Sequence, residues 1–516
     1  MTTNLKFDGG VLAGDVFTPT EELLEHAARA ATGLAGLGVG PGDAVALLMR
    51  NDLPFVEASF AAAQLGAAPV PVNWHGTADE VGYILADSKA KVLVVHADLL
   101  APLRTAVPEG VAVIGVPTPA AVAKRYDIAA LCELPADVPS WSDWLQGFDP
   151  WDRELEGAPL SMIYTSGTTG RPKGVRRLPE GLDPELQAVY HEELKRFLGL
   201  EPGMRTVVTG PMYHTAPNNH ALIAAQLGGF VVLQPRFDAE ELLELVELHR
   251  ISHLHMVPTM FVRLLKLDDA VRARYDVSSI RHVVHAAAPC PPDVKWAMIE
   301  WWGPVVHEYY GGTETGAIVG CTSEEWLAHP GTVGQPLATA SVRIFDEHGN
   351  EQPPNVPGEV YVRAAGYPDF TYQGKPDARS EVERQGLVTV GDIGYLDEDG
   401  FLYLCDRKRD MVISGGVNIY PIEIEACLLK LEGVRDCAVF GIPDEEFGES
   451  LAAAVECEAG CELTVDAVKA HVREHLAGFK VPRLVTFHDE LPREDSGKIF
   501  KRKLRAPYWE AAGRAI

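Results

Sequence analysis

The chain has 516 residues, 47% of them hydrophobic and 23% charged, which is the composition of a globular protein with more than one domain. Its formal net charge of −28 argues against a nucleic-acid-binding surface, and an anionic substrate would need a locally positive site. No apolar run reaches the ~18 residues of a membrane span. Neither end carries a secretory or peroxisomal signal, so we expect a cytoplasmic location.

The first hundred residues alternate between helical and strand patterns. Residues 20–37 repeat apolar side chains every three or four positions after Thr20, which predicts a capped amphipathic helix. Further helices are expected at 54–65 and 78–87, and the apolar runs AVALLM and KVLVV (91–95) predict buried strands. This alternation is typical of a doubly wound α/β sheet.

The alternation resumes after a stretch rich in Pro and Asp at 117–160, which we expect to cross the surface. The runs TVVT, FVVL, HLHMV and HVVH predict four strands, and helices are expected at 238–249 and 292–302. From about residue 330 the pattern changes to short strands separated by turns, which predicts a small β-rich subdomain.

The tail after residue 410 has the pattern of a compact α+β unit. Helices are expected at 421–431 and 464–477, and the runs DCAVFGI and SLAAAVE predict strands between them.

The segment YTSGTTGRPKG begins at Tyr164, directly behind an apolar run, and combines Ser and Thr hydroxyls, three glycines and a lysine. Glycines let backbone amides approach an anion closely, hydroxyls add donors, and Lys173 adds a point charge. This inventory suits a polyphosphate. The segment is not the P-loop of NTPases, because Lys173 is followed by Gly174 instead of Ser or Thr. The alternative is a surface turn.

Two later segments also bring together side chains that could serve a nucleotide. His214 follows a predicted strand in PMYHTAPNN, where a purely structural histidine is the alternative. In EYYGGTET, Tyr310 suits stacking on a base, Thr313 suits donation to a phosphate, and Glu314 suits a magnesium ion. A plain turn is the alternative for that segment.

Two polar loops complete the set. Asp392, in the Gly-flanked turn VGDIGYLDEDG, suits the two hydroxyls of a ribose. Lys498, in LPREDSGKIFKR, would alone be interpreted as a solvated charge. The only closely spaced cysteines, Cys457 and Cys461, have no second pair or histidine cluster near them in sequence, so we interpret them as ordinary thiols.

In this order the segments resemble those of the adenylate-forming superfamily, which includes acyl-CoA synthetases, nonribosomal peptide adenylation domains and luciferases. The match runs from about residue 20 to about 505. The resemblance implies an α/β fold, with a large N-terminal domain of doubly wound sheets and a mobile C-terminal α+β lid domain. The implied boundaries are 1–406 for the first domain, with its β-rich subdomain at about 330–406, then a hinge at 407–410 and a lid domain at 411–516.

The resemblance also implies ATP, Mg²⁺ and coenzyme A as cofactors or co-substrates, and it assigns roles to single residues. The catalytic residues would be Lys498, Glu314 (also the Mg²⁺ ligand), His214 and Thr165. The phosphate loop would comprise Thr165, Ser166, Gly167, Thr168, Thr169, Gly170 and Lys173. The rest of the nucleotide site would comprise Ala287, Ala288, Pro289, Glu308, Tyr309, Tyr310, Gly311, Thr313, Asp392, Leu404 and Arg407.

The lid domain carries two further assignments by resemblance. Gly415 and Gly416 would line the tunnel for the pantetheine arm of coenzyme A, although a simple hairpin turn is the alternative. Arg409 stands at the hinge position, where relatives often have Asp or Lys, so it departs from the family while keeping the cationic character of the Lys variants.

The acyl pocket, by the same resemblance, would be lined by His214, Ala216, Asn219, His220, Ala286, Gly311 and Gly312. Relatives that activate hydroxycinnamates carry Tyr at the position of Ala216, and small side chains leave volume, so we expect a long, bulky or ring-bearing hydrophobic acid. Aromatic, fatty and bile- or steroid-type acids all stay open. The alternative for the volume is filling from behind by Trp301, Trp302 or Met260, and for Asn219 and His220 it is solvation.

The resemblance therefore predicts an ATP-dependent acid:CoA ligase that makes an acyl-AMP and then transfers the acyl group to coenzyme A. Homodimers are common among relatives. Three alternatives are an enzyme that loads a carrier-protein thiol, a non-catalytic nucleotide-binding protein and, more remotely, a luciferase-like oxidase.

Overall fold

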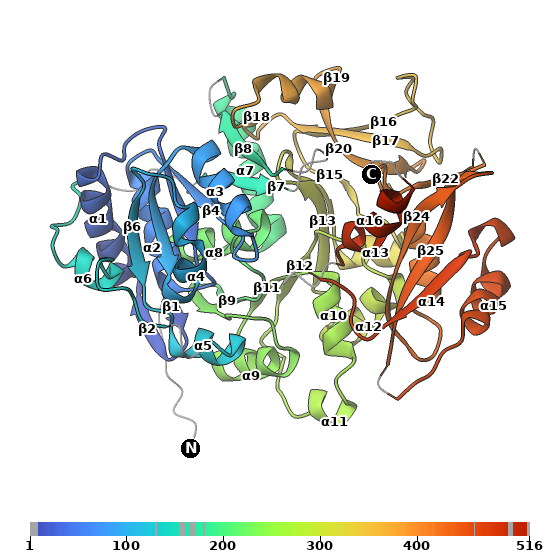
Figure 1. Cartoon of the computed structure of the whole chain (residues 1–516), viewed down its shortest axis with the longest axis horizontal. Helices are drawn as coiled ribbons and strands as arrows, with labels where there is room; N and C mark the ends of the chain where they lie inside the picture. The colour runs from blue at the N-terminus through green and yellow to red at the C-terminus, as the bar shows by residue number, and fades with distance from the viewer. Residues whose placement is uncertain are drawn as a thin grey trace.

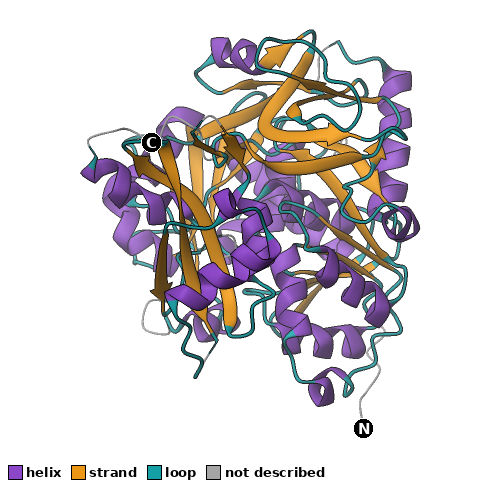
Figure 2. Ribbon diagram, turned by 90° about the vertical axis from the view of Figure 1, so that its right-hand side faces the viewer, coloured by secondary structure: helices purple, strands orange, loops and turns teal. Residues whose placement is uncertain are grey.

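The computed structural model describes residues 9–128, 132–153, 160–165, 171–178, 181–415, 417–458, 460–493 and 499–512. In this part of the chain the strands form five sheets, of nine, five, three, five and four strands (Figure 1). Helices and strands are mixed along the whole chain (Figure 2), which confirms the predicted α/β fold class. None of the described helices is long and apolar enough to cross a membrane.

A four-stranded parallel sheet, ordered β4-β3-β5-β6, forms near the N-terminus. All five residues of β3, the predicted run AVALL, are buried, because helices cover both faces of a parallel sheet. The elements of this region are α1 (Thr20–Gly36), β3 (Ala44–Leu48), α2 (Leu53–Gln64), β4 (Ala68–Pro71), α3 (Ala78–Ser88), β5 (Ala90–His96), α4 (Ala97–Leu103), β6 (Ala112–Val116), α5 (Ala120–Tyr126) and α6 (Trp141–Leu145).

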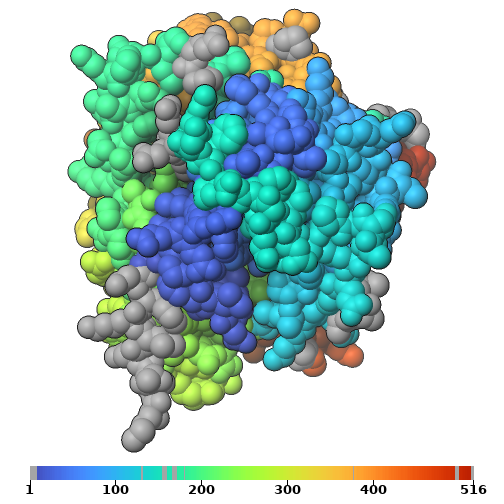
Figure 3. Space-filling view, turned by 90° about the vertical axis from the view of Figure 1, so that its left-hand side faces the viewer, coloured from blue at the N-terminus to red at the C-terminus, as the bar shows by residue number. Residues whose placement is uncertain are grey.

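Two expectations for this region were wrong in detail. Thr20 does not cap α1: the N-cap is Pro19, because a strand runs directly into the helix, and no side chain caps it. The stretch 117–160 does more than cross the surface, since it contains α5 and α6. Trp141 of α6 is buried and donates through Nε1 to Glu57 Oε2. Figure 3 shows the teal atoms of this region lying against the dark blue atoms of the N-terminal region, in agreement with the contacts between α1 and α6.

The largest sheet has the order β15-β14-β13-β12-β11-β9-β10-β1-β2. Its central strands from β1 to β13 are parallel, and its edges are antiparallel. The strands are β1 (Gly10–Ala13), β2 (Val16–Pro19), β9 (Arg205–Val208), β10 (Phe230–Leu233), β11 (His253–Met256), β12 (His282–His285), β13 (Val306–Gly312), β14 (Gly316–Cys321) and β15 (Gln335–Pro336).

Helices cover both faces of this sheet. α8 packs on one face with Val208 and Val231, and α9, α10 and α12 pack on the other with Val207 and Val232. From β9 the chain steps to β10 on one side and then returns past β9 to β11, so the strand order reverses between β9 and β11. The helices are α7 (Pro184–Leu198), α8 (Thr215–Gln226), α9 (Ala239–His249), α10 (Pro258–Leu265), α11 (Asp269–Arg272), α12 (Pro292–Trp302) and α13 (Ser323–Ala328).

Two antiparallel sheets adjoin this body. A three-stranded sheet pairs β7 (Ile163–Thr165), β8 (Lys173–Leu178) and β18 (Asp369–Tyr372). The predicted β-rich region forms a five-stranded sheet of β16 (Ala340–Phe345), β17 (Gly358–Ala364), β19 (Glu383–Arg384), β20 (Leu387–Leu396) and β21 (Leu402–Arg407).

The C-terminal residues form an α+β unit with its own hydrophobic core, built around Ile424, Val439, Val455 and Val472. In Figure 1 this unit, coloured orange to red, lies beside α10 and α12, and Lys266 Nζ donates to the carbonyl of Arg435 across the boundary. Its elements are β22 (Val412–Ser414), β23 (Val417–Ile419), α14 (Pro421–Leu428), β24 (Val434–Asp444), β25 (Gly448–Cys457), α15 (Val465–His475), β26 (Leu484–His488) and α16 (Lys501–Ala511).

Candidate active site

Several of the predicted nucleotide-site residues within the described part of the chain lie near the carboxyl ends of the large parallel strands. In open α/β sheets this edge, at the point where the strand order reverses, is where ligands bind. The reversal here lies between β9 and β11, and His214, the N-cap of α8, follows β9 at that point. Gly311 and Gly312 end β13 at the same edge.

Asp392, Arg407 and Tyr310 form one connected group. β20 and β21 pair Asp392 with Arg407, and Arg407 Nε lies 2.7 Å from Asp392 Oδ1. The hydroxyl of Tyr310 donates to Asp392 Oδ2 at 2.7 Å. Burial and the neighbouring carboxylate raise the pKa of Tyr310, so the phenol stays protonated. Leu404, also on β21, packs against the hydrophobic cluster of the β-rich sheet.

Glu314 is the centre of a second group. Its Oε1 accepts from the hydroxyl of Tyr372 at 3.2 Å and from Thr165 Oγ1 at 3.4 Å. Arg177 donates to the carbonyls of Thr313 and Glu314, which fixes the turn after β13. The other carboxylate oxygen of Glu314 accepts no hydrogen bond from the described residues, so the group fits Mg²⁺, which prefers oxygen ligands.

Two neighbours extend this group. Thr313 Oγ1 lies 2.7 Å from Thr215 Oγ1 at the start of α8, and Lys173 Nζ lies 4.9 Å from the centroid of the Tyr372 ring. We use the name nucleotide-side cluster for Thr165, Tyr310, Glu314, Asp392 and Arg407.

The segment after β12 includes a strained residue. Ala287 is exposed and has a φ of 74°, a conformation that non-glycine residues rarely adopt. Such strain persists where the surrounding structure holds it and is concentrated at ligand sites. Ala288 is half-buried and Pro289 exposed, so the predicted adenine segment presents its backbone at the sheet edge.

Glu308 also lies on β13, but its carboxylate points to the face of the sheet that α12 covers. Oε2 lies 2.6 Å from Lys295 Nζ in a fully buried ion pair and 3.5 Å from His285 Nε2. Burial raises the pKa of Glu308 against the effect of Lys295. A contribution of Glu308 to nucleotide binding would therefore run through its backbone. No local pattern in the sequence singles out Lys295, because its buried partner Glu308 lies on a different element.

On the acyl side, His214 is half-buried, and its ring centroid lies 4.4 Å from that of Tyr213. Ala216 and Asn219 are half-buried on the first turns of α8. Gly311 has a structural role of its own, because a Cβ there would lie 1.9 Å from the carbonyl oxygen of Gly316. A Cβ on Gly312 would meet Val390 at 3.4 Å, close to an ordinary contact, so packing explains Gly312 much less than Gly311.

Behind Ala216 lies a row of polar side chains that the sequence only partly indicated. His220 is buried, so the solvation alternative for it was wrong. Its Nε2 lies 2.9 Å from Thr206 Oγ1. The Nε2 of His255 lies 3.0 Å from the hydroxyl of Tyr309, and the rings of His220 and His255 lie 5.7 Å apart. We use the name α8-face polar cluster for Thr206, His220, His255 and Tyr309.

Met260, Trp301 and Trp302 pack with the hydrophobic cluster of the opposite face, the one covered by α9, α10 and α12. They therefore do not fill space on the α8 face. Ala286 is buried directly after β12.

At the junction that precedes the C-terminal unit, the carbonyl of Arg409 accepts a hydrogen bond from Arg505 at 3.1 Å. Gly415 has a φ of 57° in the turn between β22 and β23, and a Cβ there would meet the Phe447 ring at 2.9 Å. The hairpin alone thus explains Gly415. The predicted residues that lie outside the described part of the chain are Ser166, Gly167, Thr168, Thr169, Gly170, Gly416 and Lys498.

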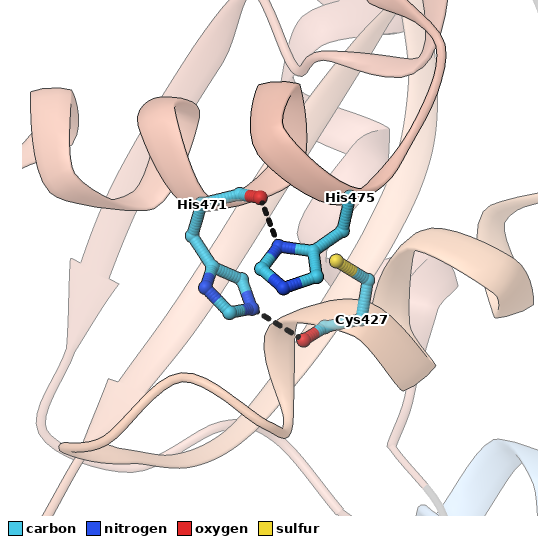
Figure 4. A group of neighbouring side chains, drawn as sticks. All are labelled: Cys427, His471 and His475. Atoms are coloured by element: carbon cyan, nitrogen blue, oxygen red, sulfur yellow. Dashed lines mark hydrogen bonds between the residues drawn. The ribbon is translucent and has the colours of Figure 1, made fainter.

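Cys427, His471 and His475 form a separate group between α14 and α15 (Figure 4), with one ligand-type atom of each within 4.8 Å of the others. The ring of His471 bonds to the carbonyl of Cys427 at 3.0 Å, and that of His475 to the carbonyl of His471 at 2.8 Å. The first bond links the two helices, the second lies within α15, and each uses one nitrogen of its ring. The histidines are one helical turn apart, a spacing visible in the sequence, but Cys427 is too distant in sequence to be grouped with them.

Comparison with known proteins agrees with this arrangement. Residues 20–367 match the family of AMP-binding enzymes, and residues 423–498 match the AMP-binding enzyme C-terminal domain. A feruloyl-CoA synthase of Amycolatopsis is 34% identical over 94% of this chain and 92% of its own length. A methyl-dioxo-octahydroindenyl-propanoyl:CoA ligase of Mycobacterium tuberculosis is 34% identical over 95% of this chain and 93% of its own length.

Among solved structures, ATP-bound MatB from Rhodopseudomonas palustris is similar with a TM-score of 0.81 and 27% identity, covering 97% of this chain and 96% of that one. The fold, the order of the motifs and these matches agree along almost the whole chain. The protein therefore belongs to the adenylate-forming superfamily, as a member of its AMP-forming acyl-CoA ligases.

Proposed function

We propose that the protein is an ATP- and Mg²⁺-dependent acid:CoA ligase for a hydrophobic monocarboxylic acid. The observation that carries this proposal is the nucleotide-side cluster. Its groups, suited to ribose and to metal-bound phosphate, gather around the carboxyl end of β13, and the contact of Thr313 with Thr215 connects them to the start of α8, beside the strand-order reversal. A non-catalytic scaffold would have no need for this combination.

The chemistry needs two displacements. A carboxylate is a poor acyl donor, so its oxygen first attacks the α-phosphorus of ATP, which releases pyrophosphate and forms an acyl-AMP. The thiol of coenzyme A then attacks the acyl carbon, and AMP leaves. Mg²⁺, when bound, would neutralise part of the phosphate charge.

The residues of the chain would divide these tasks. Glu314 would hold the metal ion, with Thr165 and Tyr372 orienting its carboxylate through hydrogen bonds. Asp392 would accept hydrogen bonds from the ribose hydroxyls, and Arg407 and Tyr310 would hold it in place. Lys498 would stabilise the charge that develops at the α-phosphorus.

The two half-reactions would share this site through a rotation of residues 411–516 about 407–410. The C-terminal unit has its own core, so it can move as one body. The junction is held in this structure by the bond from Arg505 to the carbonyl of Arg409, which would break and re-form during rotation.

For the acid, we propose a ring-bearing or otherwise bulky hydrophobic chain. The small side chains of Ala216 and Ala286 lie on the α8 face, and the large side chains Met260 and Trp302 pack on the other face. The names of the two relatives described above specify ring-bearing acids, which supports the same class for this chain.

The test is AMP release with ATP, Mg²⁺ and a panel of acids, each with and without coenzyme A. The panel spans acetate, octanoate, palmitate, benzoate, ferulate and a bile acid. We expect CoA-dependent turnover of a bulky acid. Activation without a response to CoA would indicate a carrier-protein thiol as acceptor, and absence of AMP release with every acid would contradict the proposal.

A further inference from the structure

We propose that the acid carries a hydrogen-bonding oxygen, such as a ring hydroxyl or ketone, at the end remote from its carboxylate, and that the α8-face polar cluster binds this oxygen. This inference rests on the proposed acid:CoA ligase function, because it concerns the same acyl side. The residues concerned lie on α8 and on the strands β9, β11 and β13 that it faces.

The four residues share one face of the sheet. Leu254 and Met256 of β11 pack on the α9, α10 and α12 face, so the alternation of the strand places His255 on the α8 face. Val207 likewise places Thr206 there, and on β13 the buried pair of Glu308 with Lys295 of α12 leaves Tyr309 on the α8 face. The observed bonds to His220 agree with this assignment.

The cluster lies at a defined depth below the sheet edge. Tyr309 is two residues before Gly311 on β13, which is about 6.6 Å along a strand. On α8, His220 is four residues after Ala216, about one helical turn deeper on the same side of the helix. Small side chains thus lie at the edge, and polar ones lie beneath them by two strand residues or one helical turn.

The polar groups are neutral. Burial lowers the pKa of His255 to about 4 and that of His220 well below its usual range, so neither imidazole carries charge near neutral pH. Burial raises the pKa of Tyr309, although its side chain keeps partial exposure. Tyr309 is the half-buried member of the cluster, whereas Thr206, His220 and His255 are buried, so it is the residue through which a substrate can reach these groups.

Neutral donors and acceptors at this depth suit an uncharged oxygen better than a hydrocarbon tail. Each pair in the cluster, Thr206 with His220 and His255 with Tyr309, uses one nitrogen of its imidazole. The hydroxyl of Tyr309 can accept as well as donate, so the second pair can take either a substrate hydroxyl or a substrate carbonyl. A purely aliphatic chain in the same place would exclude water from these groups without offering a hydrogen bond in return. The lost hydrogen bonds would lower the affinity for such an acid.

The experiment uses two matched pairs of acids that differ only in the distal oxygen: 4-hydroxycinnamate with cinnamate, and 4-oxocyclohexylpropanoate with cyclohexylpropanoate. We measure kcat/KM for CoA-dependent AMP release and take the ratio within each pair. In the native protein we expect at least one oxygenated acid to be preferred roughly ten- to hundredfold.

In Tyr309→Phe and His255→Gln the preference should fall toward one, and the pH profile of the ratio should stay flat between pH 6.5 and 8. Tyr395→Phe is the matched control, since this tyrosine stacks on Tyr403 in the β-rich sheet and should keep the native ratio. Using a ratio within one variant removes any general loss of activity, and a melting curve for each variant checks that it folds.

The outcomes separate the two proposals. Turnover of both members of each pair at equal rates in the native protein would overturn the inference while leaving the ligase function intact. An unchanged preference in both Tyr309→Phe and His255→Gln would overturn the assignment to this cluster. Absence of AMP release with every acid would overturn the ligase function itself, and this inference with it.

Discussion

The nucleotide-side cluster and the α8-face polar cluster lie on the same sheet but use different chemistry. The first contains charged groups, among them Glu314 and the ion pair of Asp392 with Arg407. The second consists of neutral groups whose ionisation is suppressed by burial. Charged groups at the rim suit a polyphosphate and its metal ion, whereas neutral groups beneath suit the uncharged part of an acid.

Because of this difference, we expect the nucleotide side to determine the rate of adenylation and the α8 face to determine which acid is accepted. Charge developing at phosphorus is stabilised by charge, so substitutions at the nucleotide side should affect the rate of adenylation strongly. Neutral hydrogen bonds to a substrate are individually modest, so substitutions on the α8 face should mainly change which acid is accepted. The predictions below test this division.

The largest effect is expected for Lys498→Ala, which should lower kcat for acyl-AMP formation by roughly 10²–10³. The physical reason is the loss of a cation at the reacting phosphate. Thioester formation from preformed acyl-AMP should stay mostly intact. Pyrophosphate release measures the first half-reaction, and CoA consumption with synthetic acyl-AMP measures the second.

The control is Lys503→Ala, which removes an exposed lysine from α16 and should leave both half-reactions unchanged. Equal loss of both half-reactions in Lys498→Ala would contradict the assigned role.

A smaller effect is expected for Asp392→Asn, which should raise KM for ATP roughly tenfold to hundredfold, because a charged acceptor for the ribose hydroxyls is lost. KM for the acid should change much less. Steady-state kinetics with each substrate varied in turn measures this difference. Asp399→Asn, in the exposed turn that joins β20 to β21, is the matched control.

A parallel rise in both KM values would show that Asp392 acts through general stability. The bond from Tyr310 makes that outcome a real alternative, so the melting temperature of the variant belongs in the same experiment.

Much of this arrangement was predictable from sequence because it follows from local pattern. Buried runs such as AVALL and FVVL became strands, and the pairing of β20 with β21 brought the predicted residues Asp392 and Arg407 together. Tyr372 and Arg177 were missed, since they reach Glu314 only through the pairing of β18 with β8, whose partners lie almost two hundred residues apart in sequence.

The same reasoning explains the incomplete view of the acyl side. His220 was singled out from its neighbourhood, but nothing local indicates that His255 and Tyr309 lie beside it. Their meeting depends on the order of strands in the large sheet. Side chains from different strands can be assigned to one site only when the order of the strands in the sheet is known.

An intermediate effect, on selectivity, is expected for Ala216→Tyr. The larger side chain would occupy space on the α8 face, so kcat/KM for bulky acids should fall about tenfold relative to small ones. The acid panel described above measures the shift. Ala273→Tyr, at an exposed position after α11, should leave the profile unchanged. An unaltered profile in Ala216→Tyr would show that Ala216 does not line the acyl site.

The smallest effect concerns stability and pH. Burial lowers the pKa of His255 to about 4, against about 6.5 in an unfolded chain. Between these values the unfolded chain binds a proton that the folded chain does not, so this contribution to stability is complete above pH 6.5 and is lost as the pH falls toward 4. The melting temperature should therefore fall across this range, and the fall should be smaller in His255→Gln.

Many carboxylates also titrate in this range. The native protein and His255→Gln are therefore compared by the slope of melting temperature against pH. His348→Gln changes an exposed histidine and should keep the native slope. An identical slope in His255→Gln would mean that His255 binds its proton over the same pH range in the folded and the unfolded chain. The α8-face polar cluster would then gain charge as the pH falls below about 6.5, and its contrast with the nucleotide side would disappear there.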